Sequence, residues 1–144
     1  MATYFWGEGN IGTKPEYREI ANGNNDPRRL LRLNVYFDNS IPNRAGEYED
    51  RGGFWAGVDL WHKDAEHYST LYTKGMRVLV VGRMIMEKWE DDKGNECRTM
   101  KVRADRVGIL PHRVDRVFMV VQERSAPEVD EQMHIPLSAN DGAH

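Results

Sequence analysis

Residues 53–61, which read Gly-Phe-Trp-Ala-Gly-Val-Asp-Leu-Trp, constrain the fold of this chain more than any other stretch. Bulky apolar and aromatic residues at this density, with no helical period, predict a β-strand. Side chains alternate between the two faces of a strand, so one face holds apolar residues suited to a core. These residues are Phe54, Ala56, Val58 and Leu60. The other face, which is poor core chemistry, carries Trp55, Gly57, Asp59 and Trp61.

The two indoles of this second face have two interpretations. Trp55 and Trp61 are six residues apart, which places them about 20 Å apart at roughly 3.3 Å per residue. That distance suits a flat platform along which unpaired bases stack in turn. The alternative is that both indoles are buried in a subunit interface or a second core, because tryptophan is first of all a large hydrophobic side chain.

Length, charge and cysteine content narrow the class of protein. A chain of 144 residues suits one domain with a short extension. It has no apolar run of about 18 residues and no visible signal peptide, so we expect no membrane span. The single cysteine, Cys97, suits a reducing compartment. The net charge of −3 lies entirely in residues 113–144, and a neutral body can still bind a polyanion if its cations line one groove.

The remaining sequence predicts an all-β domain. Further strands are expected over residues 3–12, 28–38, 77–89 and 98–107, with a short one over 17–21. Residues 22–27 and 39–53 are expected to be loops, residues 64–72 a short helix with Asp64 as N-cap, and residues 90–96 a hairpin tip turning at Gly94. Five strands with a helix between the third and fourth is the layout of the OB-fold, a five-stranded Greek-key barrel that binds ligands on its second and third strands. We therefore predict an OB-fold over residues 1–112 and a short acidic extension, partly disordered, over residues 113–144.

The segments that partly match enzyme motifs each depart from the full pattern. Residues 7–12 match the glycine spacing of dinucleotide-binding loops, but Pro15 and a β-like continuation follow where a helix should begin. Gly12-Thr13-Lys14 reverses the order of lysine and threonine in a P-loop. His62 and His67 lack neighbours that complete a metal site. With no nucleophile–base pair either, we expect no enzyme, no metal and no cofactor.

Six motifs between about Tyr4 and Leu110, in matching order and spacing, resemble those of the bacterial-type single-stranded DNA-binding proteins, an OB-fold family. They are Asn10-Ile-Gly12 with Pro15-Glu-Tyr-Arg18, Gly46-Glu47 with Phe54-Trp55, Val58-Asp-Leu-Trp61, Glu66 with Tyr72 and the run to Gly82, Lys88-Trp89 with Asp91 and Gly94, and Val102 with Ala104-Asp105, Val107 and Leu110.

The resemblance implies which residues bind DNA. Trp55, Trp61 and Trp89 are expected to stack on bases, each contact contributing about 1–3 kcal/mol whatever the sequence. A further stacking aromatic of the family is replaced by Ile41, and Tyr36 or Phe37 is expected to compensate. Phosphate contacts, which make binding strongly salt-dependent, are expected from basic residues. The candidates are Arg28, Arg32, Arg44, Arg51, Arg83, Lys88, Arg98, Lys101 and Arg103.

The implied function is sequence-independent binding and protection of single-stranded DNA during replication, recombination and repair, by a cytoplasmic, nucleoid-associated protein. The family usually assembles as tetramers through strand pairing between barrels, so we expect a homotetramer, with a dimer as the alternative. Replication and repair proteins are candidate partners, but the short tail lacks the family's long linker and terminal acidic tip, which residues 128–137 resemble only faintly, so we do not expect recruitment through it. The alternative function is an OB-fold adaptor or structural subunit of a replication-restart or conjugation complex, with the aromatic face used for protein contact.

Overall fold

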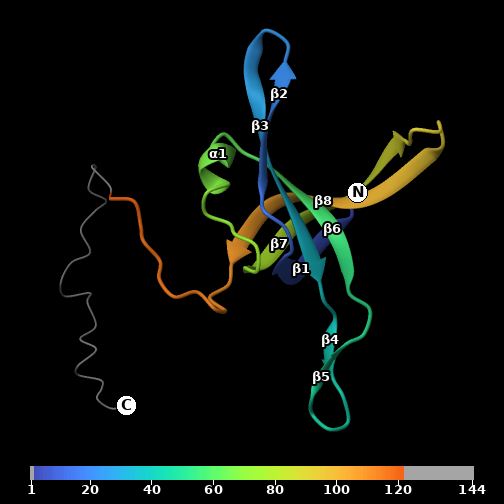
Figure 1. Cartoon of the computed structure of the whole chain (residues 1–144), viewed down its shortest axis with the longest axis vertical. Helices are drawn as coiled ribbons and strands as arrows, with labels where there is room; N and C mark the ends of the chain where they lie inside the picture. The colour runs from blue at the N-terminus through green and yellow to red at the C-terminus, as the bar shows by residue number, and fades with distance from the viewer. Residues whose placement is uncertain (1, 122–144) are drawn as a thin grey trace. The chain divides into compact units, whose positions relative to one another are not determined.

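The computed structural model describes residues 2–121, in which eight strands and one short helix follow one another (Figure 1). In chain order they are β1 (Tyr4–Ile11), β2 (Glu16–Asn22), β3 (Asn25–Phe37), β4 (Ser40–Pro42), β5 (Tyr48–Asp50), β6 (Phe54–Trp61), α1 (Ala65–Tyr68), β7 (Arg77–Glu90) and β8 (Glu96–Ile109). One compact unit ends at Val114, and a second begins at Asp115.

Five of the strands close a barrel. The strand order is β1-β7-β8-β6-β3-β2, and β1 also pairs with β3, which joins the two sides of the sheet. Strands β6 and β8 are parallel, whereas the other pairs are antiparallel. The hairpins β2–β3, β4–β5 and β7–β8 extend outward from this ring in Figure 1. The predicted five-stranded barrel, with a short helix before its fourth strand, is therefore the architecture observed.

The barrel interior is filled by one face of each strand, as the alternation predicts. The buried apolar residues of the core are Ile11, Leu31, Leu33, Val35, Phe37, Ala56, Val58, Leu60, Ala65, Tyr72, Val78, Val80, Val102, Ala104 and Val107. Phe54, which was expected on a core face, is 40% exposed, and Met86 of β7 is 49% exposed. Phe54 is the first residue of β6, and Met86 lies where β7 and β8 extend as a hairpin arm, so the closed core does not enclose either of them.

Two predicted loops are wrong, because both contain paired strands. Asn22 pairs with Asn25, so only Gly23, with a φ of 61°, and Asn24 form the turn between β2 and β3. Pro27 is tolerated within β3 because the pairing is irregular between Ile20 and Asn22, so Pro27 needs no ladder partner there. Residues 39–53 hold the β4–β5 hairpin, which pairs Ser40 with Asp50.

The predicted helix is shorter than expected, while the predicted hairpin tip is confirmed. The α-helix covers only Ala65–Tyr68, and the Asp64 side chain makes no capping hydrogen bond. The β7–β8 tip turns at Gly94, which has a φ of 79°. Asp91 fixes this tip, because its carboxylate accepts hydrogen bonds from the backbone amides of Lys93 and Asn95.

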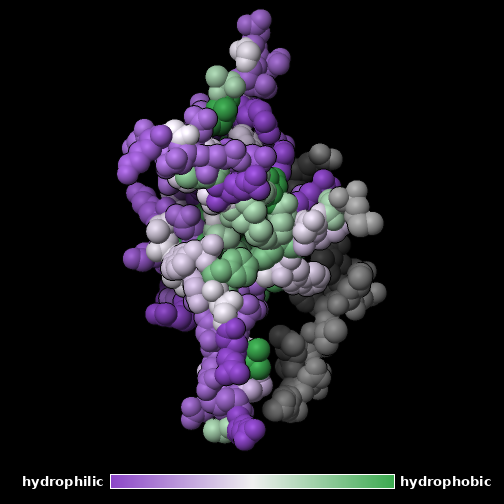
Figure 2. All heavy atoms as spheres, turned by 90° about the vertical axis from the view of Figure 1, so that its right-hand side faces the viewer, coloured by the Kyte–Doolittle hydropathy of each residue, from purple (hydrophilic) through white to green (hydrophobic). Residues whose placement is uncertain are grey.

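The surface of the barrel also carries apolar groups. Figure 2 shows apolar residues gathered in the middle of one face, with hydrophilic residues toward the hairpins above and below. Within the second unit, the apolar residues from Val117 to Val121 are exposed. The predicted acidic tip at residues 128–137 lies outside the described residues. No helix in the described part of the chain is long and apolar enough to cross a membrane.

Candidate nucleic-acid interface

The outer face of β3, β6, β8 and β7 collects many of the predicted DNA-binding residues. Trp55 and Asp59 project from β6, and their register partners on β3 are Tyr36 and Arg32. Asp59 is also in register with Arg103 of β8, which is opposite Arg83 of β7. Paired residues share a face of the sheet. Strands that are distant in the sequence therefore bring aromatic and basic groups together here.

Trp55 is exposed and held in place by its neighbours. Its side chain is 61% exposed, so the alternative that this indole is buried in the chain's own core is wrong. The ring lies 5.3 Å from that of Tyr36, centroid to centroid, and over Gly12, where a Cβ atom would collide with the indole. The Tyr36 hydroxyl donates a hydrogen bond to Asp50, and this bond raises the pKa of Tyr36. Beside the indole is a hollow lined by Thr13, Asn34, Ala56, Gly57, Thr99 and Met100.

Trp89 lies close to the same hollow. Its side chain is 48% exposed, and Nε1 donates a hydrogen bond of 2.8 Å to Oγ1 of Thr99. Because Thr99 also lines the hollow beside Trp55, one hydroxyl links the surroundings of both indoles. Thr99 was not predicted as a site residue, because a single hydroxyl in a strand belongs to no motif. Its only signal was its place on the strand predicted to pair with the one that carries Trp89.

Trp61 forms a second, more basic end of this face. It is half-buried, and the Arg28 guanidinium lies 4.1 Å from the centroid of its ring, a cation–π contact. A second hollow is lined here by Asp26, Pro27, Arg28, Arg29, Trp61, His62 and Lys63. Arg29 is fixed by a hydrogen bond of 2.9 Å from Nη1 to the carbonyl of Lys63. Arg28 is thus positioned beside an indole, as expected for a cation that accompanies base stacking.

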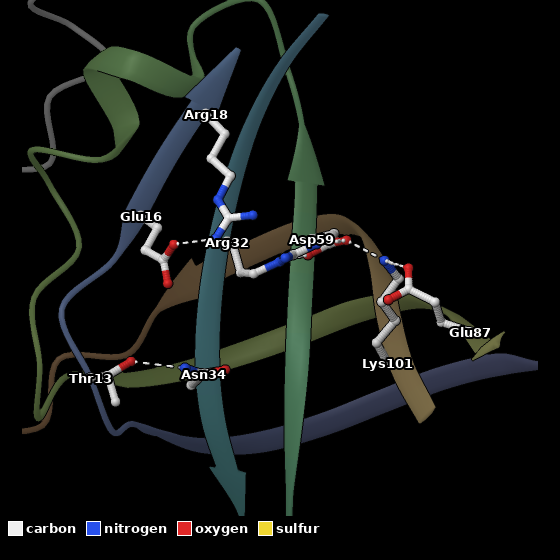
Figure 3. Close-up of polar contacts among 8 residues, drawn as sticks. All are labelled: Thr13, Glu16, Arg18, Arg32, Asn34, Asp59, Glu87 and Lys101. Atoms are coloured by element: carbon white, nitrogen blue, oxygen red, sulfur yellow. Dashed lines mark hydrogen bonds and ion pairs between the residues drawn. The ribbon is translucent and has the colours of Figure 1, made fainter. Parts of the chain in front are cut away.

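Between the two ends lies a group of four charged residues, Arg32, Asp59, Lys101 and Glu87, which we call the Asp59 cluster (Figure 3). Arg32 contacts both carboxylate oxygens of Asp59, through Nε at 2.8 Å and Nη2 at 3.1 Å. Nζ of Lys101 lies 2.8 Å from Oδ2 of Asp59 and 2.6 Å from Oε2 of Glu87. Asp59 is only 1% exposed, although it projects from the outer face of β6.

The electrostatics of this cluster favour its charged form. Burial by itself raises the pKa of Asp59, but hydrogen bonds from Arg32 and Lys101 outweigh burial and hold that pKa below its usual value of 3.8. Burial likewise opposes the charge on Lys101, and its contacts with Asp59 and Glu87 nevertheless raise the pKa of Lys101. Two cations and two carboxylates therefore form a neutral strip across the middle of the face.

Arg83 and Arg103 are two exposed cations that pair with no carboxylate of residues 2–121. They are direct register partners on β7 and β8, and both are exposed. Within the part of the chain that the structure describes, neither has an acidic side chain within 4.0 Å. Arg83 instead lies 6.0 Å from the ring centroid of Tyr4. Like charges directly opposite on neighbouring strands are destabilising, and an anion bound between them would remove this cost.

The other predicted cations lie apart from the indoles. Lys88 and Arg98 are register partners, but they are one residue out of phase with Trp89 and Thr99, so they lie on the opposite side of the β7–β8 arm. Arg98 also contacts Glu96 at 3.4 Å. Two more cations belong to the β4–β5 region, where Arg44 and Arg51 line a separate hollow and Arg51 contacts Glu49 at 3.1 Å.

A second exposed aromatic face was not predicted as a site. Tyr4 and Trp6 of β1 are 73% and 76% exposed, and Trp6 is opposite Val81 of β7. We call Tyr4, Trp6, Leu79 and Val81 the β1 face. Its signal in the sequence was the aromatic run of residues 4–6, in which Phe5 packs against the core and its two neighbours point outward. Across residues 2–121, no cluster of three or more His, Cys, Asp or Glu side chains is arranged to hold a metal ion.

The sequence of this chain is similar to those of known single-stranded DNA-binding proteins. A single-stranded DNA-binding protein of Aquifex aeolicus is 25% identical over 104 residues, which cover 72% of this chain and 69% of that protein. One from Deinococcus radiodurans is 29% identical over 102 residues, covering 71% of this chain but only 32% of that longer protein.

Solved structures confirm the OB-fold. A small single-stranded DNA-binding protein from Streptomyces coelicolor superposes with a TM-score of 0.63 at 19% identity, over 78% of this chain and 98% of the other. A Plasmodium falciparum protein described as an SSB complex with ssDNA gives a TM-score of 0.59 at 17% identity, over 76% and 96% of the two chains. The model of the single-strand binding protein family, which is a family of binding proteins and not of enzymes, matches residues 8–110. The chain therefore belongs to the single-strand binding protein family.

Proposed function

We propose that this chain binds and protects single-stranded DNA without sequence preference, by stacking bases on Trp55, Trp89 and Trp61. The observation that carries the proposal is the exposure of the Trp55 and Trp89 indoles on one outer face of the barrel, with Thr99 between them. Every base has a face on which an aromatic ring can stack, so this mode of binding tolerates any sequence. Tyr36 supports Trp55 from the neighbouring strand.

Phosphate contacts complete the proposed mode of binding. Arg28 lies beside Trp61, and Arg83 and Arg103 form an unneutralised pair on the same face. We assign the main phosphate contacts to these three residues. Arg44, Arg51, Lys88 and Arg98 would meet only a strand that extends around the β4–β5 or β7–β8 hairpin. A protein of this kind would act on the unpaired DNA of replication, recombination and repair, in the cytoplasm and at the nucleoid.

A fluorescence titration with oligo-dT tests the proposal. Stacked bases quench indole emission, so the wild-type chain should show saturable quenching at low salt, and binding should weaken as salt is added. The matched control is the Trp6→Ala variant, which removes an exposed indole outside the interface and should retain both the affinity and the quenching. Absence of quenching at low salt in the wild type would overturn the proposal.

We propose further that the chain forms a homo-oligomer through the β1 face. Tyr4 and Trp6 expose large aromatic rings, and Trp6 lies opposite Val81 of β7 while Tyr4 lies opposite Arg83, an arrangement that suits contact with a second copy. A tetramer is expected, and native mass spectrometry with and without oligo-dT would measure the number of chains. The adaptor alternative makes a different prediction, because the Trp55→Ala, Trp89→Ala double variant would then lose a protein partner and keep its affinity for DNA.

A further inference from the structure

Two of the cations expected to contact phosphates are already committed to Asp59. Arg32 and Lys101 occupy the centre of the candidate interface, between the Trp55 end and the Trp61 end. Arg32 engages both oxygens of the Asp59 carboxylate, and Lys101 contacts Asp59 and Glu87 (Figure 3). The centre of the interface therefore holds two cations but carries no net charge.

Burial makes these contacts costly to exchange for contacts with DNA. The Asp59 side chain is 2% exposed, and Lys101 is 17% exposed. If a phosphate drew Arg32 away, a buried carboxylate would lose its bidentate partner, which is far more costly than a solvent-exposed ion pair is stabilising. Arg103 can contact a phosphate without this cost, because it is exposed and no described carboxylate lies within 4.0 Å of it.

We propose that Asp59 is a positioning residue that withholds Arg32 and Lys101 from the phosphates. The inference rests on the proposed function and refines it. The neutral strip then serves as the floor beneath bases that run between the indoles, while the phosphates follow Arg28 at one end and the Arg83–Arg103 pair at the side. Binding releases fewer counterions than the number of cations on the face suggests, so the affinity depends less on salt than it would if every cation met a phosphate.

The salt dependence of oligo-dT affinity tests this role with two charge-matched variants. Asp59→Asn and Glu87→Gln each remove one negative charge from the cluster. Within residues 2–121, Asp59 is the only acidic residue paired with Arg32, whereas Lys101 has both Asp59 and Glu87. Asp59→Asn therefore frees Arg32, and Glu87→Gln leaves both cations paired with Asp59.

The two variants should separate in a plot of log affinity against log salt concentration. Freeing one cation for a phosphate should steepen the slope of Asp59→Asn by about 0.7, which corresponds to a further loss of about 2.6-fold in affinity between 50 and 200 mM salt. Glu87→Gln should keep the wild-type slope. Equal steepening in both variants would mean that net charge alone acts, and no steepening in Asp59→Asn would mean that Arg32 was never withheld; either result overturns the proposal.

A second pair of variants leaves Asp59 in place, in case its replacement prevents folding. Arg32→Met should leave the slope unchanged, whereas Arg103→Met, which removes a neighbouring cation that no carboxylate neutralises, should reduce the slope by about 0.7. An Arg32→Met slope that falls as far as that of Arg103→Met would contradict the role of Asp59. Failure of the proposed function would look different, because the wild type itself would then not bind oligo-dT.

Discussion

Two outer faces of one barrel expose indoles to similar degrees but surround them differently. Trp55, 61% exposed, stands beside a hollow lined by Thr13, Asn34 and Thr99. Trp6, 76% exposed, stands opposite Val81, and the far end of β1 is closed by an ion pair between Glu8 and Arg77. Exposure alone therefore does not indicate which partner covers an indole. The side chains around the indole do indicate it, because polar groups and unneutralised cations suit a nucleic acid, whereas aliphatic residues suit another protein surface.

The largest expected effect separates the two faces directly. The Trp55→Ala, Trp89→Ala double variant should lose at least about 30-fold in affinity for oligo-dT, because each stacked base contributes about 1–3 kcal/mol. Trp6→Ala should stay within about twofold of the wild type, since removing it takes away no stacking contact. Fluorescence anisotropy with a labelled oligonucleotide measures both affinities, and circular dichroism checks the fold. If Trp6→Ala lost as much affinity for oligo-dT as the double variant, the assignment of DNA binding to the Trp55 face alone would be contradicted.

Two paired carboxylates, Asp59 at the centre of the candidate interface and Asp38 just after β3, offer a further comparison. Asp59 and Asp38 both have a pKa below the usual 3.8, Asp38 through its hydrogen bond with Arg77. Their contributions to the free energy of unfolding are thus present above pH 3.8 and lost as the pH falls toward the folded pKa. Asp59→Asn and Asp38→Asn should each cost about 1–3 kcal/mol at pH 7 and progressively less in acid. Thermal unfolding from pH 3 to pH 7 measures this, and only Asp59→Asn should also alter the salt dependence of DNA binding.

Mutations in the β1 face should weaken the assembly of the oligomer. Trp6→Ala removes a large exposed ring from the proposed contact between copies and should raise the dissociation constant of the oligomer at least about tenfold. Sedimentation velocity over a range of protein concentrations measures the shift. Trp55→Ala serves as the matched control and should sediment like the wild type. If Trp55→Ala dissociates the oligomer and Trp6→Ala does not, the assignment of the two faces is reversed.

Single cations should have smaller effects. Arg83→Met should make the salt dependence of oligo-dT affinity shallower by about 0.7 in slope, because one phosphate contact is lost. Arg18→Met is a suitable control, since Arg18 is half-exposed on β2 and already paired with Glu16 at 2.8 Å. Its slope should match the wild type. Equal changes in both variants would show that binding responds to total charge and not to the Arg83–Arg103 pair.

The smallest effect is expected at Gly12, over which the Trp55 ring lies. A Cβ atom there would collide with the indole, so Gly12→Ala should tilt the ring and weaken oligo-dT binding about two- to fivefold, a fraction of one stacking contact. Gly108→Ala is the control, because a Cβ at Gly108 comes no closer than 3.9 Å to the Leu79 carbonyl oxygen. Unchanged affinity in Gly12→Ala would show that bases do not use the observed position of the indole.

The sequence predicted the barrel well because alternation within a strand is a local property. The inward face of β6 was predicted from residues two apart, and the same rule placed Trp55 on the face opposite the core. The hairpin at Gly94 was equally local. The β4–β5 hairpin was missed because it is held by contacts such as that between Asn39 and Asp50, polar residues whose composition alone indicates a loop.

Features that depend on register between distant strands could not be predicted. The Asp59 cluster exists because β3, β6 and β8 align residues that are far apart in the sequence, with 27 positions between Arg32 and Asp59 and 42 between Asp59 and Lys101. From the sequence, Asp59 was recognised only as a carboxylate between two indoles, and its pairing with Arg32 and Lys101 was not predicted. Lys88 is a different case, because it is adjacent to Trp89 and therefore faces the other side of the arm, which alternation within the strand could have predicted.

Proteins that keep a single indole test the central assignment most directly. One variant retains only Trp55 and another only Trp6, with the other tryptophans replaced by phenylalanine, and each is titrated with oligo-dT at low salt. We predict saturable quenching for the Trp55 protein and an unchanged emission for the Trp6 protein. Quenching of the Trp6 protein, together with unchanged emission from the Trp55 protein, would contradict the account.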